Sequence, residues 1–386
     1  MKNFYYDIIC PYAYLAFTRL NRQNLFDKIK LKPILLGGLF KLMNQDTNPN
    51  KNLSKIKSEY MREDIKRQAS LWDINLNFHE LHPVSSLKAM RLIHACDESL
   101  RVKLSEKLYN YYWQDNININ EDNFINNLAQ EYSCKNLEES KKLLLHATEE
   151  AFSKHIFGVP TFEINNRTYF GSDRLDLISR DIGLKLEDIS WDSCVNKTID
   201  FYFDFTSPYS YLAYIELLEA QKAGVKINFK PILLGALLKE RGIEGVPMFG
   251  AHAYKAAYYL QDMFDWAQAR KANFIFNTSF PLRTVMALRI ALIESQAIKA
   301  FFEAAWVNNL DIGQEEIILS VLEKAGLEPN LLKRANENNI KEQLKALTQE
   351  ALSKNIFGVP SFMVNNKLVF GQDRFMWLKH ELAQNK

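Results

Sequence analysis

The sequence contains one internal repeat with a very long period, and this repeat restricts the possible folds more than any other feature. The segment Phe-Tyr-Tyr-Asp-Ile-Ile-Cys-Pro-Tyr-Ala-Tyr-Leu-Ala begins at residue 4 and returns at residue 201 as Phe-Tyr-Phe-Asp-Phe-Thr-Ser-Pro-Tyr-Ser-Tyr-Leu-Ala. Lys-Pro-Ile-Leu-Leu-Gly recurs at residues 32 and 230, and Ile-Phe-Gly-Val-Pro at residues 156 and 356. Solenoid repeats have periods of about 20 to 50 residues, so each copy here is expected to be a whole domain with its own core.

Each copy begins with the pattern of a βαβ unit. Residues 3–9 are mostly aromatic and β-branched, as in a strand, and Pro11 follows at the place where proline is favoured, the first helical position. Cys10 and Ser207 are therefore expected to be helix N-cap residues. Residues 29–36 and 225–234 are short and mostly apolar, which is typical of a buried parallel strand.

The remainder of each copy is predicted to be a helical insertion followed by a hairpin and a last helix. Long amphipathic patterns fill residues 39–155 and 237–355. Paired asparagines then stand between short apolar runs, which indicates a tight hairpin. The last helix is expected to start at Ser172 in the first copy and at Gln372 in the second.

These patterns predict an α/β protein of two tandem domains. The first domain is expected to span residues 1–190 and the second residues 197–386, with the boundary near the Trp-Asp-Ser segment at residue 191. In each domain the helical insertion separates a βαβ half from a ββα half.

The charged residues are balanced and dispersed. Of the 386 residues, 48 are Lys or Arg and 46 are Asp or Glu, so the formal charge is +2. This argues against nucleic acid or an anionic membrane as the main partner. No apolar stretch reaches the roughly 20 residues of a spanning helix, and no signal-peptide pattern precedes the first strand. We therefore expect a soluble, cytoplasmic protein.

The cysteines and histidines do not have the spacing of a disulfide framework or a metal site. Cys10, Cys96, Cys134 and Cys194 are far apart and form no Cys-x-x-Cys pair. The His-Glu-Leu-His segment at residue 79 lacks the i, i+4 spacing of a helical zinc site. We expect neither a disulfide framework nor a bound metal.

The strand-to-helix junction is the first candidate for chemistry. Free backbone N–H groups at a helix N-terminus stabilise an anion. At Cys10 they would lower the thiol pKa, and at Ser207 the hydroxyl could donate a hydrogen bond to a bound thiolate. The alternative is plain N-capping, for which Ser before Pro is ordinary and Cys is not.

The second candidate is the Gly-Val-Pro segment before the hairpin. A cis bond at Val159-Pro160 and at Val359-Pro360 would turn the valine backbone outward, where it could pair with an extended peptide. The alternative is a simple edge-strand proline.

The order of these motifs resembles a known family. Ser-Pro-Tyr-Ser, a long helical segment containing Tyr60-Met61-x-x-Asp64, then Phe-Gly-Val-Pro and Phe-Gly-x-Asp-Arg are similar to the kappa-class glutathione transferases and the 2-hydroxychromene-2-carboxylate isomerases. Both belong to the DsbA-like branch of the thioredoxin superfamily. The resemblance covers nearly the whole chain, once per copy, and implies two tandem thioredoxin-like domains and glutathione as the cofactor.

The resemblance also implies roles for individual residues. It assigns Ser207 as the group that activates the glutathione thiol, places Cys10 at the equivalent position, and implies that the valine before each cis-proline pairs with the cysteinyl backbone. The residues expected to bind glutathione are Asn48, Val159, Pro160, Ser172, Asp173, Val359, Pro360, Gln372 and Asp373. The residues expected near the substrate are Tyr12, Lys41, Tyr209, Ser210 and Lys239.

Some of these assignments have structural alternatives. Asp173 and Asp373 could be ordinary helix-start carboxylates followed by Arg. Lys41 and Lys239 could attract an anionic substrate or be solvated lysines at a helix start. Asn48 has no counterpart in the second copy, which has Gly-Ile-Glu at residue 242 instead.

The predicted activity is that of a glutathione-dependent isomerase or transferase, in which the glutathione thiol attacks a small electrophilic aromatic or unsaturated acid. One alternative is a monothiol oxidoreductase that uses Cys10, because Ala13 stands where a resolving cysteine would be needed. A further alternative is a non-catalytic binding module. Since relatives of this type form dimers, the resemblance implies an intramolecular pseudo-dimer of the two copies.

Overall fold

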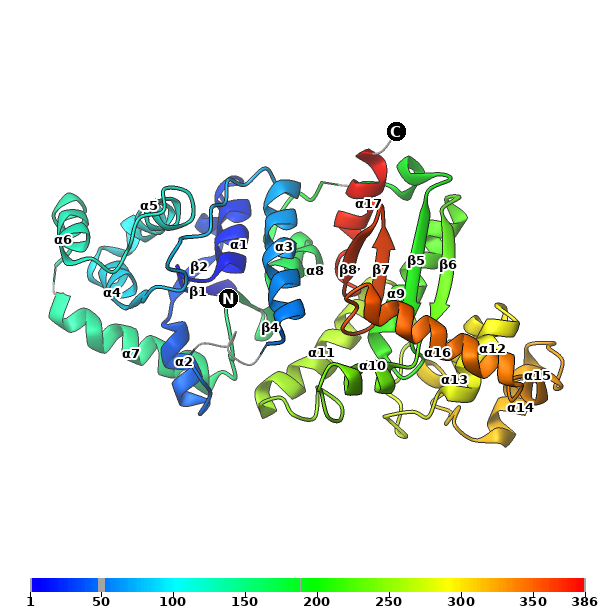
Figure 1. Cartoon of the computed structure of the whole chain (residues 1–386). Helices are drawn as coiled ribbons and strands as arrows, with labels where there is room; N and C mark the ends of the chain where they lie inside the picture. The colour runs from blue at the N-terminus through cyan, green and yellow to red at the C-terminus, as the bar shows by residue number, and fades with distance from the viewer. Residues whose placement is uncertain (1, 48–52, 136, 188, 385–386) are drawn as a thin grey trace. The chain divides into compact units, whose positions relative to one another are not determined.

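The computed structural model describes residues 2–47, 53–135, 137–187 and 189–384. It divides into two compact units, Met1–Glu187 and Asp188–Lys386, and each contains one four-stranded sheet with helices around it (Figure 1). The two tandem α/β domains predicted from the repeat are confirmed.

The two sheets have the same topology. In the first unit the strands are β1 (Lys2–Tyr6), β2 (Lys30–Pro33), β3 (Thr161–Ile164) and β4 (Arg167–Phe170), in the order β2-β1-β3-β4. In the second unit they are β5 (Thr198–Phe203), β6 (Lys226–Pro231), β7 (Ser361–Val364) and β8 (Lys367–Phe370), in the order β6-β5-β7-β8. The first pair of each unit is parallel and the other pairs are antiparallel.

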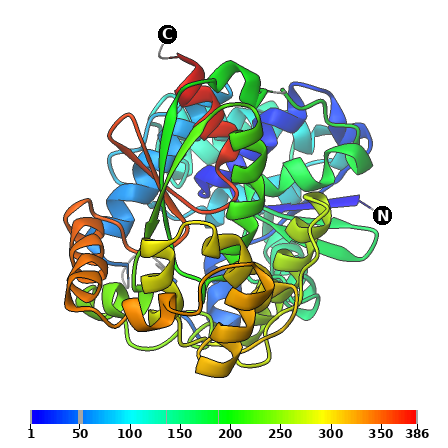
Figure 2. The ribbon, with the colours of Figure 1, turned by 90° about the vertical axis from the view of Figure 1, so that its right-hand side faces the viewer.

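Most of each unit is helical. The helices of the first unit are α1 (Pro11–Asn21), α2 (Leu36–Leu42), α3 (Lys55–Leu71), α4 (Leu87–Ala95), α5 (Arg101–Trp113), α6 (Asp122–Glu131), α7 (Leu137–Ser153) and α8 (Leu175–Ile182). Those of the second are α9 (Pro208–Lys222), α10 (Leu234–Glu240), α11 (Ala253–Ala269), α12 (Val285–Ile293), α13 (Ala297–Trp306), α14 (Glu315–Lys324), α15 (Leu331–Arg334), α16 (Asn338–Ser353) and α17 (Phe375–Gln384). Helices α12 to α15, yellow to orange, gather beyond the end of the sheet at which β5 and β6 finish (Figure 2).

The alternation of the central strand determines which helix covers each face. In β5, Phe203 points to the side of α9 and packs against Phe229 and Phe302. Tyr202 points to the opposite side, where its hydroxyl contacts Glu350 and Lys354 at the end of α16. Successive side chains of a strand face opposite ways, so this aromatic strand anchors a helix layer on each face.

The strands are shorter than the sequence patterns predict. The predicted segments 29–36 and 225–234 contain strands of only four and six residues. Their last residues already belong to the next helix, because α2 starts at Leu36 and α10 at Leu234. The last helix also starts later than expected, since Ser172–Arg174 forms a 3₁₀ turn and α17 begins at Phe375.

The predicted hairpins are confirmed. Asn165 and Asn166 have φ of 52° and 65°, and Asn365 and Asn366 have φ of 49° and 61°. Two consecutive residues with positive φ form the type I′ turn that suits the strand twist.

One cysteine pair corrects our expectation that the cysteines form no disulfide framework. Cys96, at the end of α4, and Cys134, after α6, form a disulfide with their Cα atoms 4.2 Å apart. They are 38 residues apart in the sequence, so only the packing of α4 beside α6 brings them together. Cys10 and Cys194 are free and buried.

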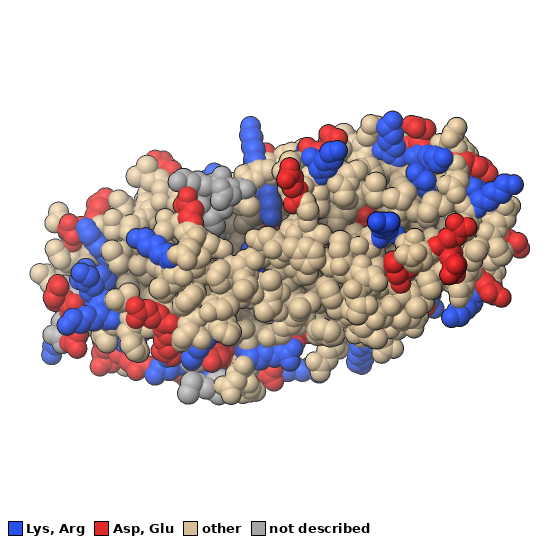
Figure 3. All heavy atoms as spheres, turned by 90° about the horizontal axis from the view of Figure 1, so that it is seen from below, with Lys and Arg blue, Asp and Glu red and all other residues tan. Residues whose placement is uncertain are grey.

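The segment that follows the first unit packs within the second. Trp191–Cys194 forms a 3₁₀ turn, and the Trp191 indole lies edge-on against Phe375 and donates to Glu216 at 3.0 Å. Neither a helix long and apolar enough to cross a membrane nor a group of three metal-ligand side chains occurs in the described parts of the chain. Figure 3 shows one face on which acidic and basic side chains are interspersed.

Candidate functional site

The N-terminus of α9 presents the Ser207 hydroxyl. Ser207 is the N-cap residue, and its Oγ accepts a hydrogen bond from the Ser210 N–H at 3.1 Å. The same hydroxyl lies 3.5 Å from the Val359 carbonyl oxygen. The N-cap and the Gly-Val-Pro segment, 152 residues apart, therefore meet at one place.

The first unit repeats this arrangement with a thiol. Cys10 is the N-cap residue of α1 but makes no side-chain capping bond. Its Sγ donates instead to the Val159 carbonyl oxygen at 3.2 Å. The bonds Val159-Pro160 and Val359-Pro360 are both cis, as predicted.

Cys10 does not have the lowered pKa that its helix position suggested. Burial raises the pKa of the thiol to about 12, and the nearby Asp7 carboxylate adds to this, while backbone N–H groups at Ala13 and Tyr12 only partly oppose it. Desolvation penalises the thiolate more than the helix terminus stabilises it. At neutral pH Cys10 is a protonated hydrogen-bond donor.

A buried carboxylate supports the N-cap loop in both units, and we did not predict its role. Asp204 accepts from the N–H groups of Leu234 and Thr206 at 2.8 and 3.1 Å and from the Thr284 hydroxyl at 2.6 Å. Burial raises its pKa. The sequence contained a signal for this carboxylate, because one Asp follows the apolar strand in each copy.

Asp7 is the counterpart in the first unit. Its carboxylate accepts from the N–H groups of Leu36 and Ile9 at 2.8 and 3.2 Å. Burial raises the pKa of Asp7 to about 6, although these bonds and one from Ser86 act in the opposite direction.

The Gly-x-Asp turn after the hairpin has a tight geometry in both units. Gly171 and Gly371 have φ of 114° and 106°, and a Cβ atom there would lie 2.5 and 2.7 Å from Oδ1 of Asp173 and Asp373. Only glycine fits, since the carboxylate folds back over it. Each Asp also pairs with the following Arg, at 2.7 Å for Asp173 and 3.0 Å for Asp373.

The residues before these aspartates are buried. Ser172 is 3% exposed, and its hydroxyl lies 3.2 Å from Gln68 Oε1. Gln372 is 2% exposed, and its Nε2 has no hydrogen-bond partner among the described residues. The second unit therefore holds a buried amide donor that a ligand could satisfy.

Tyr209 of the Ser-Pro-Tyr-Ser motif faces helix α11. The Tyr209 hydroxyl donates to Asp262 Oδ2 and the Tyr258 hydroxyl to Oδ1, both at 3.3 Å. Ser210 is fully buried, with no described hydrogen-bond partner for its Oγ. Tyr12 is half-buried at the start of α1.

Lys255 is a residue that the sequence reasoning missed. It lies seven residues before Asp262 on the same helix, about two turns away along the same face. It is half-buried, and burial lowers the pKa of its ammonium group. A cation without full hydration suits a ligand carboxylate.

The remaining predicted residues lie elsewhere or outside the described structure. Lys41 and Lys239 are exposed in the last turns of α2 and α10, so the alternative that they are lysines at a helix start was wrong. Asn48 lies outside the described residues.

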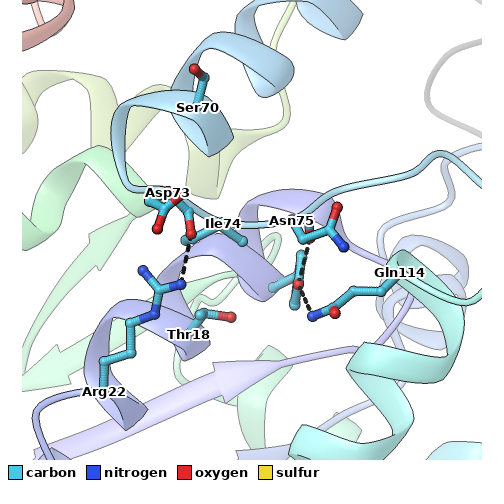
Figure 4. A pocket seen from close by; sticks show the side chains of 8 residues that line it. Thr18, Arg22, Ser70, Asp73, Ile74, Asn75 and Gln114 are labelled. Atoms are coloured by element: carbon cyan, nitrogen blue, oxygen red, sulfur yellow. Dashed lines mark hydrogen bonds between the residues drawn. The ribbon is translucent and has the colours of Figure 1, made fainter.

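A cavity of about 530 Å³ opens in the first unit between α1, α3 and α5 (Figure 4). Arg22 donates to the carbonyl oxygens of Trp72 and Asp73, and Gln114 donates to the Tyr14 hydroxyl. None of the residues lining it is one of the predicted site residues.

Comparison with known proteins shows to which family the chain belongs. The sequence pattern described as the DSBA-like thioredoxin domain matches residues 3–183 and again residues 198–383. The chain belongs to this family. Each unit thus corresponds to one DSBA-like thioredoxin domain.

Two similar proteins have about half the length of this chain. It is 29% identical over 195 residues to 2-hydroxychromene-2-carboxylate isomerase of Sphingobium xenophagum, a match that covers 49% of this chain and 99% of the relative. It is 26% identical over 208 residues to glutathione S-transferase kappa 1 of Rattus norvegicus, covering 49% and 92%. A solved 2-hydroxychromene-2-carboxylate isomerase structure matches at 26% identity and a TM-score of 0.45, covering 48% and 95%.

Proposed function

We propose that this protein is a glutathione-dependent isomerase or transferase whose working site lies in the second unit. The observation that carries the proposal is the meeting of the Ser207 hydroxyl with the Val359 carbonyl, 3.5 Å apart at the N-terminus of α9. A hydroxyl donor for a thiolate and a backbone edge for an extended peptide are thereby brought together. Both relatives named above carry activities of this class in their names.

The residues present fit glutathione. The Val359 backbone would pair with the cysteinyl part. Gln372 and Asp373 would hold the γ-glutamyl end, because the free Gln372 amide can donate to its carboxylate and Asp373 can pair with its amino group. Lys255 would attract the glycyl carboxylate.

When bound, glutathione supplies the nucleophilic thiol. The Ser207 hydroxyl oxygen accepts from the Ser210 N–H, and its proton points to the Val359 carbonyl oxygen. A bound thiolate would accept this proton in place of the carbonyl. The N-terminus of α9 adds a favourable potential. The substrate is proposed to be a small electrophilic aromatic or unsaturated acid.

The oxidoreductase alternative lacks support. Cys10 is buried, and its pKa of about 12 leaves almost no thiolate at neutral pH. The first unit is therefore proposed to be a structural partner of the second.

The full chain tests this proposal through Ser207→Ala. A hydrogen bond to a charged group contributes about 1.5–3 kcal/mol, so the apparent pKa of bound glutathione should rise by about one to two pH units. Thiolate absorbance followed against pH measures it. Ser353→Ala, which removes an exposed hydroxyl at the end of α16, is the control. An unchanged thiol pKa in Ser207→Ala would exclude the activating role.

A further inference from the structure

In each unit a buried arginine contacts the main-chain oxygen of the middle residue of the Gly-x-Asp segment. In the second unit Arg270, directly after α11, donates through Nη2 to the main-chain oxygen of Gln372 at 2.6 Å. Its Nη1 contacts the side-chain oxygen of the same residue. The Arg270 side chain is only 8% exposed.

The first unit places a guanidinium against the equivalent carbonyl, that of Ser172, but from a different helix. Arg19 of α1 lies with Nη1 3.4 Å from the main-chain oxygen of Ser172. It is also 8% exposed, and its guanidinium lies 3.7 Å from the centre of the Trp72 ring.

The arginine that contacts this carbonyl stands at different positions of the repeat in the two units. Trp72, which follows α3, corresponds to Arg270, which follows α11, and Arg19 of α1 corresponds to Glu216 of α9. Glu216 now pairs with Arg270, with Oε2 3.8 Å from Nε. Arg270 is stacked over Trp266, at 4.9 Å from the ring centre.

Burying a guanidinium costs free energy that only close partners offset. Both units nevertheless bury a guanidinium against the equivalent main-chain oxygen, that of Ser172 or of Gln372. The two arginines stand at positions of the repeat that do not correspond to each other. The shared requirement therefore lies at the carbonyl of residue 172 or 372, and not in either helix.

The contact has a consequence for ligand binding. The oxygen of Gln372 and the N–H of Asp373 belong to one planar peptide group, so a guanidinium that holds the oxygen also sets the direction of the N–H. Because Arg270 takes the Gln372 side-chain oxygen as well, the amide Nε2 is turned away from it and stays a free donor.

We infer that Arg270 is a positioning residue that makes the second unit select thiols with a γ-glutamyl group. The inference rests on the proposed function, since it assumes that glutathione binds here. In the first unit the Ser172 hydroxyl already lies within hydrogen-bond distance of Gln68, so Arg19 holds the turn there without leaving a comparable donor.

The test compares two thiols on the full chain. Cysteinylglycine is glutathione without its γ-glutamyl group. Arg270→Lys keeps the charge but cannot hold both oxygens of Gln372 in one planar fork. We expect its affinity for glutathione to fall about tenfold, the loss typical of one charge-assisted hydrogen bond. Its affinity for cysteinylglycine should be unchanged in calorimetric titration.

Arg241→Lys is the matched control. Arg241 donates to the carbonyl oxygens of Leu352 and Ile356 at the end of α16, at 2.8 and 3.1 Å, so its loss perturbs the same unit but not the Gln372 turn. The ratio of the two affinities should stay at the wild-type value in this variant.

Two results would overturn the inference: an equal loss for both thiols in Arg270→Lys, or a change in the ratio in Arg241→Lys as well. Gln372→Ala is an independent test, because removing the side-chain amide should weaken the binding of glutathione but not the binding of cysteinylglycine. A wild-type chain that binds no glutathione would instead refute the proposed function itself.

Discussion

At the scale of single residues, burial decides what Cys10 and Ser207 can do. Both are N-cap residues beside a cis-proline valine, and each is about 7% exposed. The thiol needs to ionise to react, and desolvation opposes that. The Ser207 hydroxyl donates a hydrogen bond while neutral, so burial does not remove its ability to donate. The same backbone position therefore carries a neutral hydroxyl donor in one unit and a protonated thiol in the other.

Asp7→Asn tests the buried carboxylate behind this loop. The folded-state pKa of Asp7 is about 6, above the unfolded value of about 3.9, so its stabilising contribution is lost as pH rises between these values. Relative to wild type, the variant should gain up to about 3 kcal/mol of unfolding free energy from pH 4 to pH 7. Denaturant unfolding across this pH range measures the difference, and parallel curves would contradict the assignment.

At the scale of elements, the turn between the hairpin and the last helix requires a glycine with positive φ at residue 371. The carboxylate of Asp373 folds back over Gly371, while Asp373 pairs with Arg374. A ring contact supports the turn from the other side, since a Cβ at Gly358 would lie 2.9 Å from Phe370. The two glycines allow the strand end and the Gly-Val-Pro segment to approach closely.

Gly371→Ala is expected to lower the free energy of unfolding by about 3 kcal/mol, because it combines backbone strain with a clash against Asp373. Gly242→Ala is the matched control. Gly242 also has positive φ, 71°, but no atom lies within 4 Å of an added Cβ, so only strain of about 1 kcal/mol is expected. Equal losses in thermal or denaturant unfolding would show that the Asp373 contact contributes nothing.

At the scale of the whole molecule, the two units share a fold but differ in the side chains at the helix N-cap and at the turn before the last helix. The second unit has a neutral hydroxyl donor at Ser207 and a Gln372 amide whose Nε2 has no partner among the described residues. The first has a buried thiol and a Ser172 hydroxyl that lies against Gln68. We therefore propose that the second unit binds glutathione and that the first does not.

This asymmetry predicts that the full chain binds one glutathione. Calorimetric titration should give a stoichiometry near one, and Ser207→Ala should weaken that single event without revealing a second. Two equivalent binding events per chain would contradict the difference between the units.

Much of this protein could be read from its sequence. The repeat determined two domains, and local patterns predicted the N-cap positions and the Asn-Asn hairpins, because capping and turn conformation depend on neighbouring residues. The cis Val-Pro bonds were implied by the family resemblance. Only the tertiary structure decided the pKa of Cys10, the Cys96–Cys134 disulfide and the source of the guanidinium at residues 172 and 372. Those properties depend on which distant segments surround an atom and exclude water from it, and no local pattern records that.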